Sequence, residues 1–78
     1  MKTYELDAEQ QKLLQDAFLM IPPQEGVQQK IEVGTQALSQ VAKRLMVLTK
    51  KSREQTIMIN KLIEANQWFT DAVRKYGV

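Results

Sequence analysis

The sequence predicts an all-α protein: a short N-terminal helix followed by an antiparallel helical hairpin, assembled as a homo-oligomeric helical bundle. Apolar residues recur at steps of three and four, and β-branched residues never alternate cleanly with polar ones, which together predict helices. Assembly is expected because the chain has 78 residues and no cysteine. A single core of that size is marginal, and self-association is the most direct way to gain buried area.

The first helix is expected at about residues 8–20. Asp7 followed three residues later by Gln10 is typical of a capping box, which marks a helix start. The apolar residues after it are spaced for one helix face: Leu13, Leu14, Ala17, Phe18 and Ile21. Pro22-Pro23 ends this helix, because proline disfavours helical backbone in the residue before it.

Two heptad seams predict a second helix at about residues 27–50 and a third at about 53–76. The first seam consists of Val27, Ile31, Gly34, Leu38, Val41, Leu45 and Leu48. The second consists of Ile59, Leu62, Asn66, Phe69, Val73 and Tyr76. Ala65, Trp68 and Ala72 add another apolar stripe to the third helix, which indicates packing against a further helix or subunit.

The segment between the two seams decides the architecture. Ser52 with Gln55 is a capping-box pattern, so a turn near residues 50–52 gives a helical hairpin. No glycine or proline marks this turn and the heptad register continues through it, so one continuous helix of about 50 residues in a coiled-coil dimer stays open. The hairpin is favoured, because two apolar seams separated by polar positions suit antiparallel packing.

Charge is unevenly distributed, although the net charge is only +2. No acid occurs between Val33 and Arg53, while bases accumulate there: Lys43, Arg44, Lys50, Lys51 and Arg53. One interpretation is that these bases hold an anion such as a phosphate group. On the sequence alone the simpler interpretation is favoured, in which they complement a helix dipole and keep the surface solvated.

The composition argues against an enzyme. Without cysteine or histidine there is no zinc site, thiol nucleophile or Ser-His-Asp triad, and no glycine-rich phosphate loop occurs. No catalytic residue, metal or cofactor is therefore expected. No apolar run approaches the roughly 18 residues of a membrane span, and the acidic N-terminus lacks the order of a signal peptide. A cytoplasmic protein without a membrane partner is expected.

Several single residues have two interpretations. Trp68 and Phe69 offer flat rings for base stacking, but their helical spacing favours a place in the core. Asn66 interrupts an apolar seam, which favours a polar residue that fixes register in an oligomer over a ligand contact. Tyr4 lies before the first helix cap and is expected either to close over a ligand or to dock on a neighbouring subunit.

The last helix carries a spaced run of residues: Arg53, Leu62, Ala65, Trp68, Ala72 and Val73. Near the N-terminus, Tyr4 and Leu6 precede a first helix rich in Glu and Gln. Both features resemble a family of small phage proteins that share a helical-hairpin domain. These proteins sequester cyclic oligonucleotide signals and so blunt CBASS and Thoeris immunity. The likeness touches about half of the chain, and most matched positions are apolar or small.

The resemblance implies a viral inhibitor that acts in the host cytoplasm. It would be a homo-oligomer, a hexamer in characterised members, which binds cyclic di- or trinucleotides between subunits without cleaving them. Tyr4 takes the role of the aromatic residue that stacks on a base. The family's phosphate-contacting Lys falls where this chain has Phe18-Leu19-Met20, and Lys12 is the basic residue that precedes this position. Arg53 and Gly77 correspond to a second pocket, for cyclic trinucleotides.

Two other functions stay open. The bases near the predicted turn suit a hairpin that contacts the phosphates of DNA or RNA, although a nucleic-acid partner is less favoured than a small cyclic ligand. The unbroken heptad register suits a purely structural coiled-coil adaptor.

Overall fold

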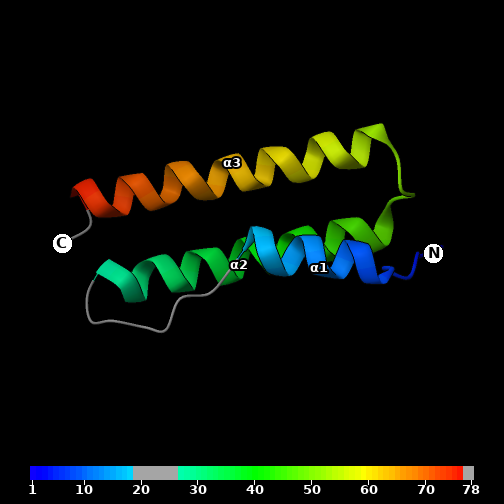
Figure 1. Ribbon diagram of the computed structural model, residues 1–78, viewed down its shortest axis with the longest axis horizontal. Helices are drawn as coiled ribbons and strands as arrows, with labels where there is room; N and C mark the ends of the chain where they lie inside the picture. The colour runs from blue at the N-terminus through cyan, green and yellow to red at the C-terminus, as the bar shows by residue number, and fades with distance from the viewer. Residues whose placement is uncertain (19–26, 77–78) are drawn as a thin grey trace.

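The computed structural model describes residues 1–18 and 27–76, which form three helices and no strand. The helices are α1 (Ala8–Ala17), α2 (Val27–Leu48) and α3 (Arg53–Tyr76). This confirms the all-α class. In Figure 1, α3 runs antiparallel to α2, and α1 lies in front of the half of α2 near the turn, with the N-terminus beside the turn that joins α2 to α3. The arrangement is compatible with the predicted antiparallel hairpin.

The start of α1 is the predicted capping box. The Asp7 carboxylate accepts a hydrogen bond of 2.7 Å from the backbone N–H of Gln10, and the Gln10 side chain accepts one of 3.0 Å from the N–H of Asp7. The helix ends at Ala17 rather than at about residue 20. Phe18 has left the helical conformation, with φ −117° and ψ 47°, and its ring is buried in the core. Residues 19–26 lie outside the described part of the chain.

The core lies near the turn end of the hairpin, where α1 packs. Its buried side chains come from all three helices: Leu14, Phe18, Ala42, Met46 and Ile59. Half-buried residues surround them, among them Leu6 from the N-terminal segment. Each large apolar side chain buried in this way contributes about 1.5–3 kcal/mol, so Leu14 of α1 and Phe18, which directly follows the helix, supply a substantial part of the core.

The joint between α2 and α3 is a four-residue turn, residues 49–52, and not a continuous helix. The hydroxyl of Ser52 accepts a hydrogen bond of 3.2 Å from the N–H of Gln55, as the predicted cap requires. The Gln55 side chain does not complete the capping box by bonding to the backbone of Ser52. It points toward the end of α2, where its amide donates to the carbonyls of Met46 and Thr49. These bonds satisfy orphan carbonyls at the end of α2 and replace the glycine that a helix end often uses.

The contact between α2 and α3 only partly follows the predicted seams. In α2 the buried positions are Ile31, Thr35, Ala42 and Met46. Val41 and Leu48, two members of the predicted seam, are exposed. The interpretation of Trp68 as a core residue is wrong for the single chain, because its side chain is 69% exposed.

Asn66 has its partner inside the chain. Its side-chain oxygen accepts a hydrogen bond of 2.9 Å from the hydroxyl of Thr35, which is buried on α2. One polar pair thus faces across the α2–α3 contact, where it fixes the register of the two helices within the hairpin.

Candidate functional site

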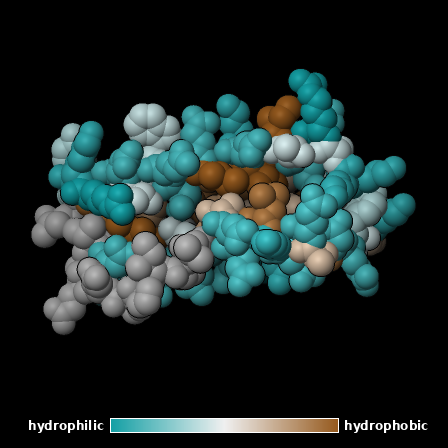
Figure 2. All heavy atoms as spheres, in the orientation of Figure 1, coloured by the Kyte–Doolittle hydropathy of each residue, from teal (hydrophilic) through white to brown (hydrophobic). Residues whose placement is uncertain are grey.

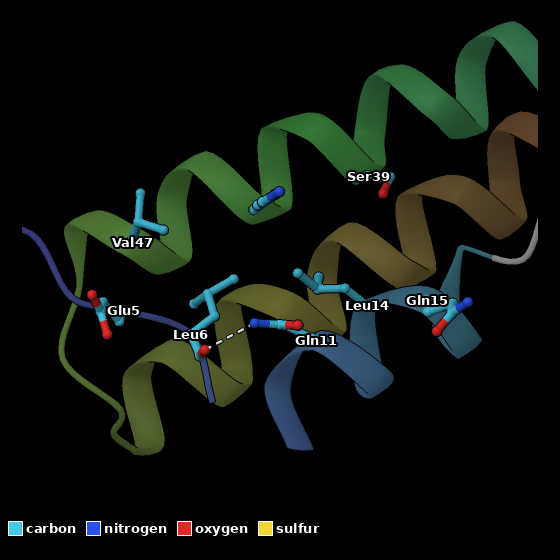
Figure 3. Close-up of a pocket in the computed structure, with 8 residues that line it drawn as sticks. Glu5, Leu6, Gln11, Leu14, Gln15, Ser39 and Val47 are labelled. Atoms are coloured by element: carbon cyan, nitrogen blue, oxygen red, sulfur yellow. Dashed lines mark hydrogen bonds between the residues drawn. The ribbon is translucent and has the colours of Figure 1, made fainter. Parts of the chain in front are cut away.

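Two grooves flank α1 on its two sides. The α1–α2 groove, about 620 Å³ in volume, lies between the N-terminal segment, α1 and α2 (Figure 3). The residues that line it are Glu5, Leu6, Gln11, Leu14, Gln15, Ser39, Lys43 and Val47. The α1–α3 groove, about 330 Å³, lies on the other side of α1 and is lined by residues that include Lys12, Leu13, Lys51 and Thr56.

The α1–α2 groove combines apolar walls with polar groups that have no partner of their own. Gln11 donates a hydrogen bond of 3.0 Å to the carbonyl of Leu6, which fixes one amide at the edge of the groove (Figure 3). Within the described part of the chain, the side chains of Gln15, Ser39 and Lys43 make neither a hydrogen bond nor an ion pair. They are therefore free to engage a polar or anionic ligand.

A smaller hollow of about 370 Å³ extends this groove across the outer side of α2. It shares Lys43 and Val47 with the groove and adds Gln40 and Arg44. Lys43 and Arg44, which are adjacent in the sequence, thus both border this stretch of α2. They belong to the segment between Val33 and Arg53 that contains no acidic residue. The face of the molecule drawn in Figure 2 is mostly hydrophilic, and apolar side chains gather near its middle.

The α1–α3 groove is electrostatically different. Lys51 lies 3.4 Å from a carboxylate oxygen of Asp7 and 3.7 Å from one of Glu9, and these ion pairs join the turn to the start of α1. The charge of Lys51 is therefore already partly balanced. Lys12, on the α1 wall of the same groove, is exposed and forms no ion pair with any described residue.

Asp7 is held as an anion by its surroundings. The backbone N–H of Gln10 lowers the pKa of its carboxyl below the ordinary value of 3.8, and the charge of Lys51 and a hydrogen bond from it lower this pKa further. Partial desolvation opposes the shift. A carboxylate engaged as a helix cap and as the partner of a lysine is a structural group, and it is poorly suited to accept a proton from a substrate.

Tyr4 is held at the edge of the α1–α2 groove by its backbone. Its N–H donates a hydrogen bond of 2.7 Å to the carbonyl of Val47, a residue that lines the groove. Its ring is half-buried, and the ammonium of Lys2 lies 5.4 Å from the ring centroid, within the range of a cation–π contact. The N-terminal segment therefore presents an aromatic ring and a cation together at the turn end of the hairpin.

The predicted ligand residues do not meet in one pocket of the single chain. Tyr4 lies near the end of α2, Lys12 on the α1–α3 groove, and Arg53 is exposed at the first position of α3. Gly77 lies outside the described residues. It follows Tyr76, which ends α3 about 35 Å from Arg53 by the rise of a helix of 24 residues.

The grooves also hold residues that sequence reasoning did not select. Gln11 and Gln15 on α1 line the α1–α2 groove, as does Ser39 on α2, four residues before Lys43, which is one of the bases that the sequence already offers for an anion. Each pair is spaced by four, which places its members on one helix face. This spacing by four can be found in the sequence. It indicates a solvent-exposed helix face as well as it indicates a groove wall, and only the position of the neighbouring helix distinguishes the two.

Comparison of the chain with models of protein families, with curated proteins and with solved structures finds no match. Within the described ranges, residues 1–18 and 27–76, no helix is long and apolar enough to cross a bilayer. The same residues contain no cluster of three or more His, Cys, Asp or Glu side chains that would hold a metal ion.

Proposed function

We propose that this protein sequesters cyclic di- or trinucleotides without cleaving them, as a homo-oligomer, and that it thereby acts as a viral inhibitor of CBASS-type defence. The proposal rests on the resemblance of the Arg53–Val73 run to the phage sequestering family and on the chemistry of the α1–α2 groove. The groove is the observation that carries it.

The groove has the groups that a cyclic nucleotide needs. Its volume, about 620 Å³, falls in the range of pockets that enclose a small molecule. Lys43, with Arg44 beside it, supplies positive charge for a phosphate, while Gln15 and Ser39 offer donors and acceptors for the edge of a base. Leu6 and Leu14 provide an apolar wall for a flat ring.

The length of α3 supports a pocket shared between chains. Arg53 and the C-terminal end of the helix are about 35 Å apart, so one chain cannot bring both to the same ligand. In a homo-oligomer the first turn of α3 from one chain meets the end of α3 from another, and symmetry repeats the pocket. This geometry supports binding between subunits.

Binding without chemistry is the mode that the charged groups favour. The carboxylates that lie closest to a cation, Asp7 and Glu9, are engaged by Lys51, and Asp7 also caps α1. A protein that removes a signal by sequestration needs enclosure and slow release, and it needs no group that transfers a proton.

Native mass spectrometry tests this proposal directly. The purified protein is measured alone and with a panel of cyclic di- and trinucleotides, with linear dinucleotides and mononucleotides as controls. We expect a compact oligomer that gains discrete ligand masses only with cyclic compounds and releases them intact. An assembly that gains no mass, or that returns linear products, contradicts the proposal.

Two matched lysine variants connect the binding to the groove. Lys43→Gln removes the cation of the α1–α2 groove, whereas Lys61→Gln removes an exposed cation in the middle of α3 that lines neither groove. We expect Lys43→Gln to weaken binding by about tenfold or more, because a hydrogen bond to a charged group contributes about 1.5–3 kcal/mol. The control variant should bind as the wild type does. Equal effects would place the ligand elsewhere.

A phosphate-contacting nucleic-acid-binding hairpin is the second candidate. Lys43, Arg44, Lys50 and Arg53 are exposed and form no ion pair with the described residues, so they remain available to phosphates. Binding of this kind falls steeply with salt and shows no preference for a small ligand. Strong, salt-sensitive binding to unrelated duplexes in a fluorescence-anisotropy titration would favour it over sequestration.

A further inference from the structure

The α1–α2 groove follows one face of α2, and its polar groups lie at different places along it. On α2 the groove is lined by Ser39, Lys43 and Val47, which follow one another at steps of four and span about 12 Å of helix. Lys43 therefore lies midway between Ser39 and Val47. A bound molecule that follows the groove meets this lysine near its middle.

The two ends of the groove differ in charge. Glu5 directly follows Tyr4, whose backbone bonds to Val47, so Glu5 lies at the end of the groove nearest the turn between α2 and α3. Figure 3 shows Glu5 at this end, and Gln15 with Ser39 at the opposite end. The turn end is therefore acidic, whereas the opposite end carries a neutral amide and a hydroxyl.

Glu5 is held in place by the residues on both sides of it. The N–H of Tyr4 donates a hydrogen bond of 2.7 Å to the carbonyl of Val47, and the carbonyl of Leu6 accepts one of 3.0 Å from the side chain of Gln11. These bonds tie the N-terminal segment to α2 just before Glu5 and to α1 just after it. The backbone at Glu5 is thus fixed while its side chain stays exposed, which lowers the entropic cost of a contact with a ligand.

The carboxylate of Glu5 has hydrogen-bonding capacity that the chain does not use. Within residues 1–18 and 27–76 it makes neither a hydrogen bond nor an ion pair, whereas Asp7 and Glu9 both engage Lys51. An ionised carboxylate has two oxygens that only accept hydrogen bonds. It repels a phosphate and is stabilised by N–H donors, so the favourable partner for Glu5 on a nucleotide is a base that presents donors.

Guanine is the base that suits a carboxylate. On its Watson–Crick edge the N1–H and the 2-amino group lie side by side, so two parallel N–H donors reach the two carboxylate oxygens. Adenine and cytosine each present an amino group beside a ring nitrogen that only accepts, and uracil places one N–H between two carbonyl oxygens. Each of these three bases turns an acceptor toward the carboxylate. A carboxylate therefore favours guanine and disfavours the other bases.

We propose that Glu5 is a specificity-determining residue that selects guanine at the turn end of the α1–α2 groove. Lys43 then contacts a phosphate at the middle of the groove. Gln15 and Ser39 meet the second base, and because both side chains donate as well as accept, they tolerate either purine. This inference rests on the proposed function, since it names the base that the same groove reads in a cyclic nucleotide.

Calorimetric titration of the full chain with three cyclic dinucleotides tests the inference. Cyclic di-GMP presents both donors, cyclic di-IMP keeps the N1–H but lacks the 2-amino group, and cyclic di-AMP has no such pair. We expect the affinity to fall in this order, with cyclic di-GMP bound about tenfold or more tighter than cyclic di-AMP. Equal affinities for the three would overturn the selection of guanine and leave sequestration standing. Binding of none of them would overturn both.

Two matched substitutions separate the reading of a base from the general effect of charge. Glu5→Gln keeps the size of the side chain and replaces one acceptor oxygen with a donor. We expect it to weaken the binding of cyclic di-GMP by about tenfold, while the affinity for cyclic di-AMP stays the same or rises because a repulsive charge is gone. Glu64→Gln, on an exposed residue of α3 that lines neither groove, should leave both affinities as in the wild type. If Glu5→Gln changes both affinities by the same factor, Glu5 acts only through its charge and the selection of guanine is wrong.

Discussion

The ring of Phe69 on α3 packs directly against the backbone of Gly34 on α2, in the space that a side chain would fill. A Cβ atom placed on Gly34 would overlap this ring. The hydrogen bond between Thr35 and Asn66 lies beside this contact, because Thr35 follows Gly34 directly and Asn66 precedes Phe69 by three residues.

Replacing Gly34 with Ala should destabilise the protein, although alanine is the better helix former. Alanine contributes about 1 kcal/mol of helix propensity, but overpacking against the Phe69 ring costs about 1–3 kcal/mol. The expected net loss in the free energy of unfolding, measured by urea denaturation, is up to about 2 kcal/mol. In a Phe69→Leu background the same Gly34→Ala change should become stabilising. If alanine stabilises both backgrounds equally, the close contact does not limit this site.

Gln55 connects all three helices, and its loss should be costly. It is 5% exposed, accepts a hydrogen bond of 3.2 Å from Gln10 on α1, and donates to the carbonyls of Met46 and Thr49 at the end of α2. Gln55→Glu removes the donor and places a charge there. We expect a loss of about 1–3 kcal/mol in the free energy of unfolding. The control Gln67→Glu, exposed on the same helix, should change it by less than about 0.5 kcal/mol.

Stability should fall as the pH drops through the acid range. The pKa of Asp7 is lower in the folded chain than its ordinary value of 3.8, chiefly because Gln10 donates its N–H to the carboxylate. A group with a depressed folded pKa stabilises the fold above the unfolded pKa, and this contribution disappears as the pH falls below 3.8 through the folded value. Thermal denaturation at a series of pH values between neutral and strongly acid measures how steeply the stability of the fold decreases with pH.

Asp7→Asn provides the control for this pH dependence. Asparagine caps a helix about as well as aspartate but does not titrate. The variant should therefore keep α1 and show a shallower decrease of stability below the ordinary aspartate pKa. An unchanged profile would mean that other carboxylates account for the acid sensitivity.

Tyr4→Ala and Arg53→Ala should weaken the binding of cyclic oligonucleotides without changing assembly. Stacking on an aromatic ring contributes about 1–3 kcal/mol per base, so the loss of Tyr4 should reduce affinity about fivefold or more. Calorimetric titration measures the affinity, and light scattering checks the mass of the assembly. If either variant loses its assembly, that residue is structural and its role as a ligand contact is wrong.

The sequence predicts the local elements of this fold well. The Asp7–Gln10 capping box and the cap of α3 by Ser52 are both present, because each depends on residues only three apart. The tertiary contacts are less predictable. Asn66 bonds to Thr35 within the chain, and Gln55 turns its amide to the end of α2 rather than to its own helix start.

The heptad seam of α2 shows why the packing is harder to derive. A helix with two apolar stripes produces one regular pattern of apolar residues, and this pattern does not say which partner each stripe meets. In this chain Ile31, Ala42 and Met46 face the core, whereas Val41 and Leu48 are exposed. The candidate site is hard to predict for the same reason. Ser39 and Lys43 can be recognised as groove residues only once the position of α1 beside them is known.

The short α1 has a consequence for the order in which the chain folds. Ten residues are fewer than the about 12–15 that an isolated helix needs in water, so α1 depends on docking for its helical form. Its hydrogen bond to Gln55 spans 45 positions of the sequence, whereas the turn between α2 and α3 joins neighbouring segments. Contacts of short sequence separation form fastest, so the hairpin should form first and α1 should dock last. The α1–α2 groove, and any ligand site in it, then exists only after this final step.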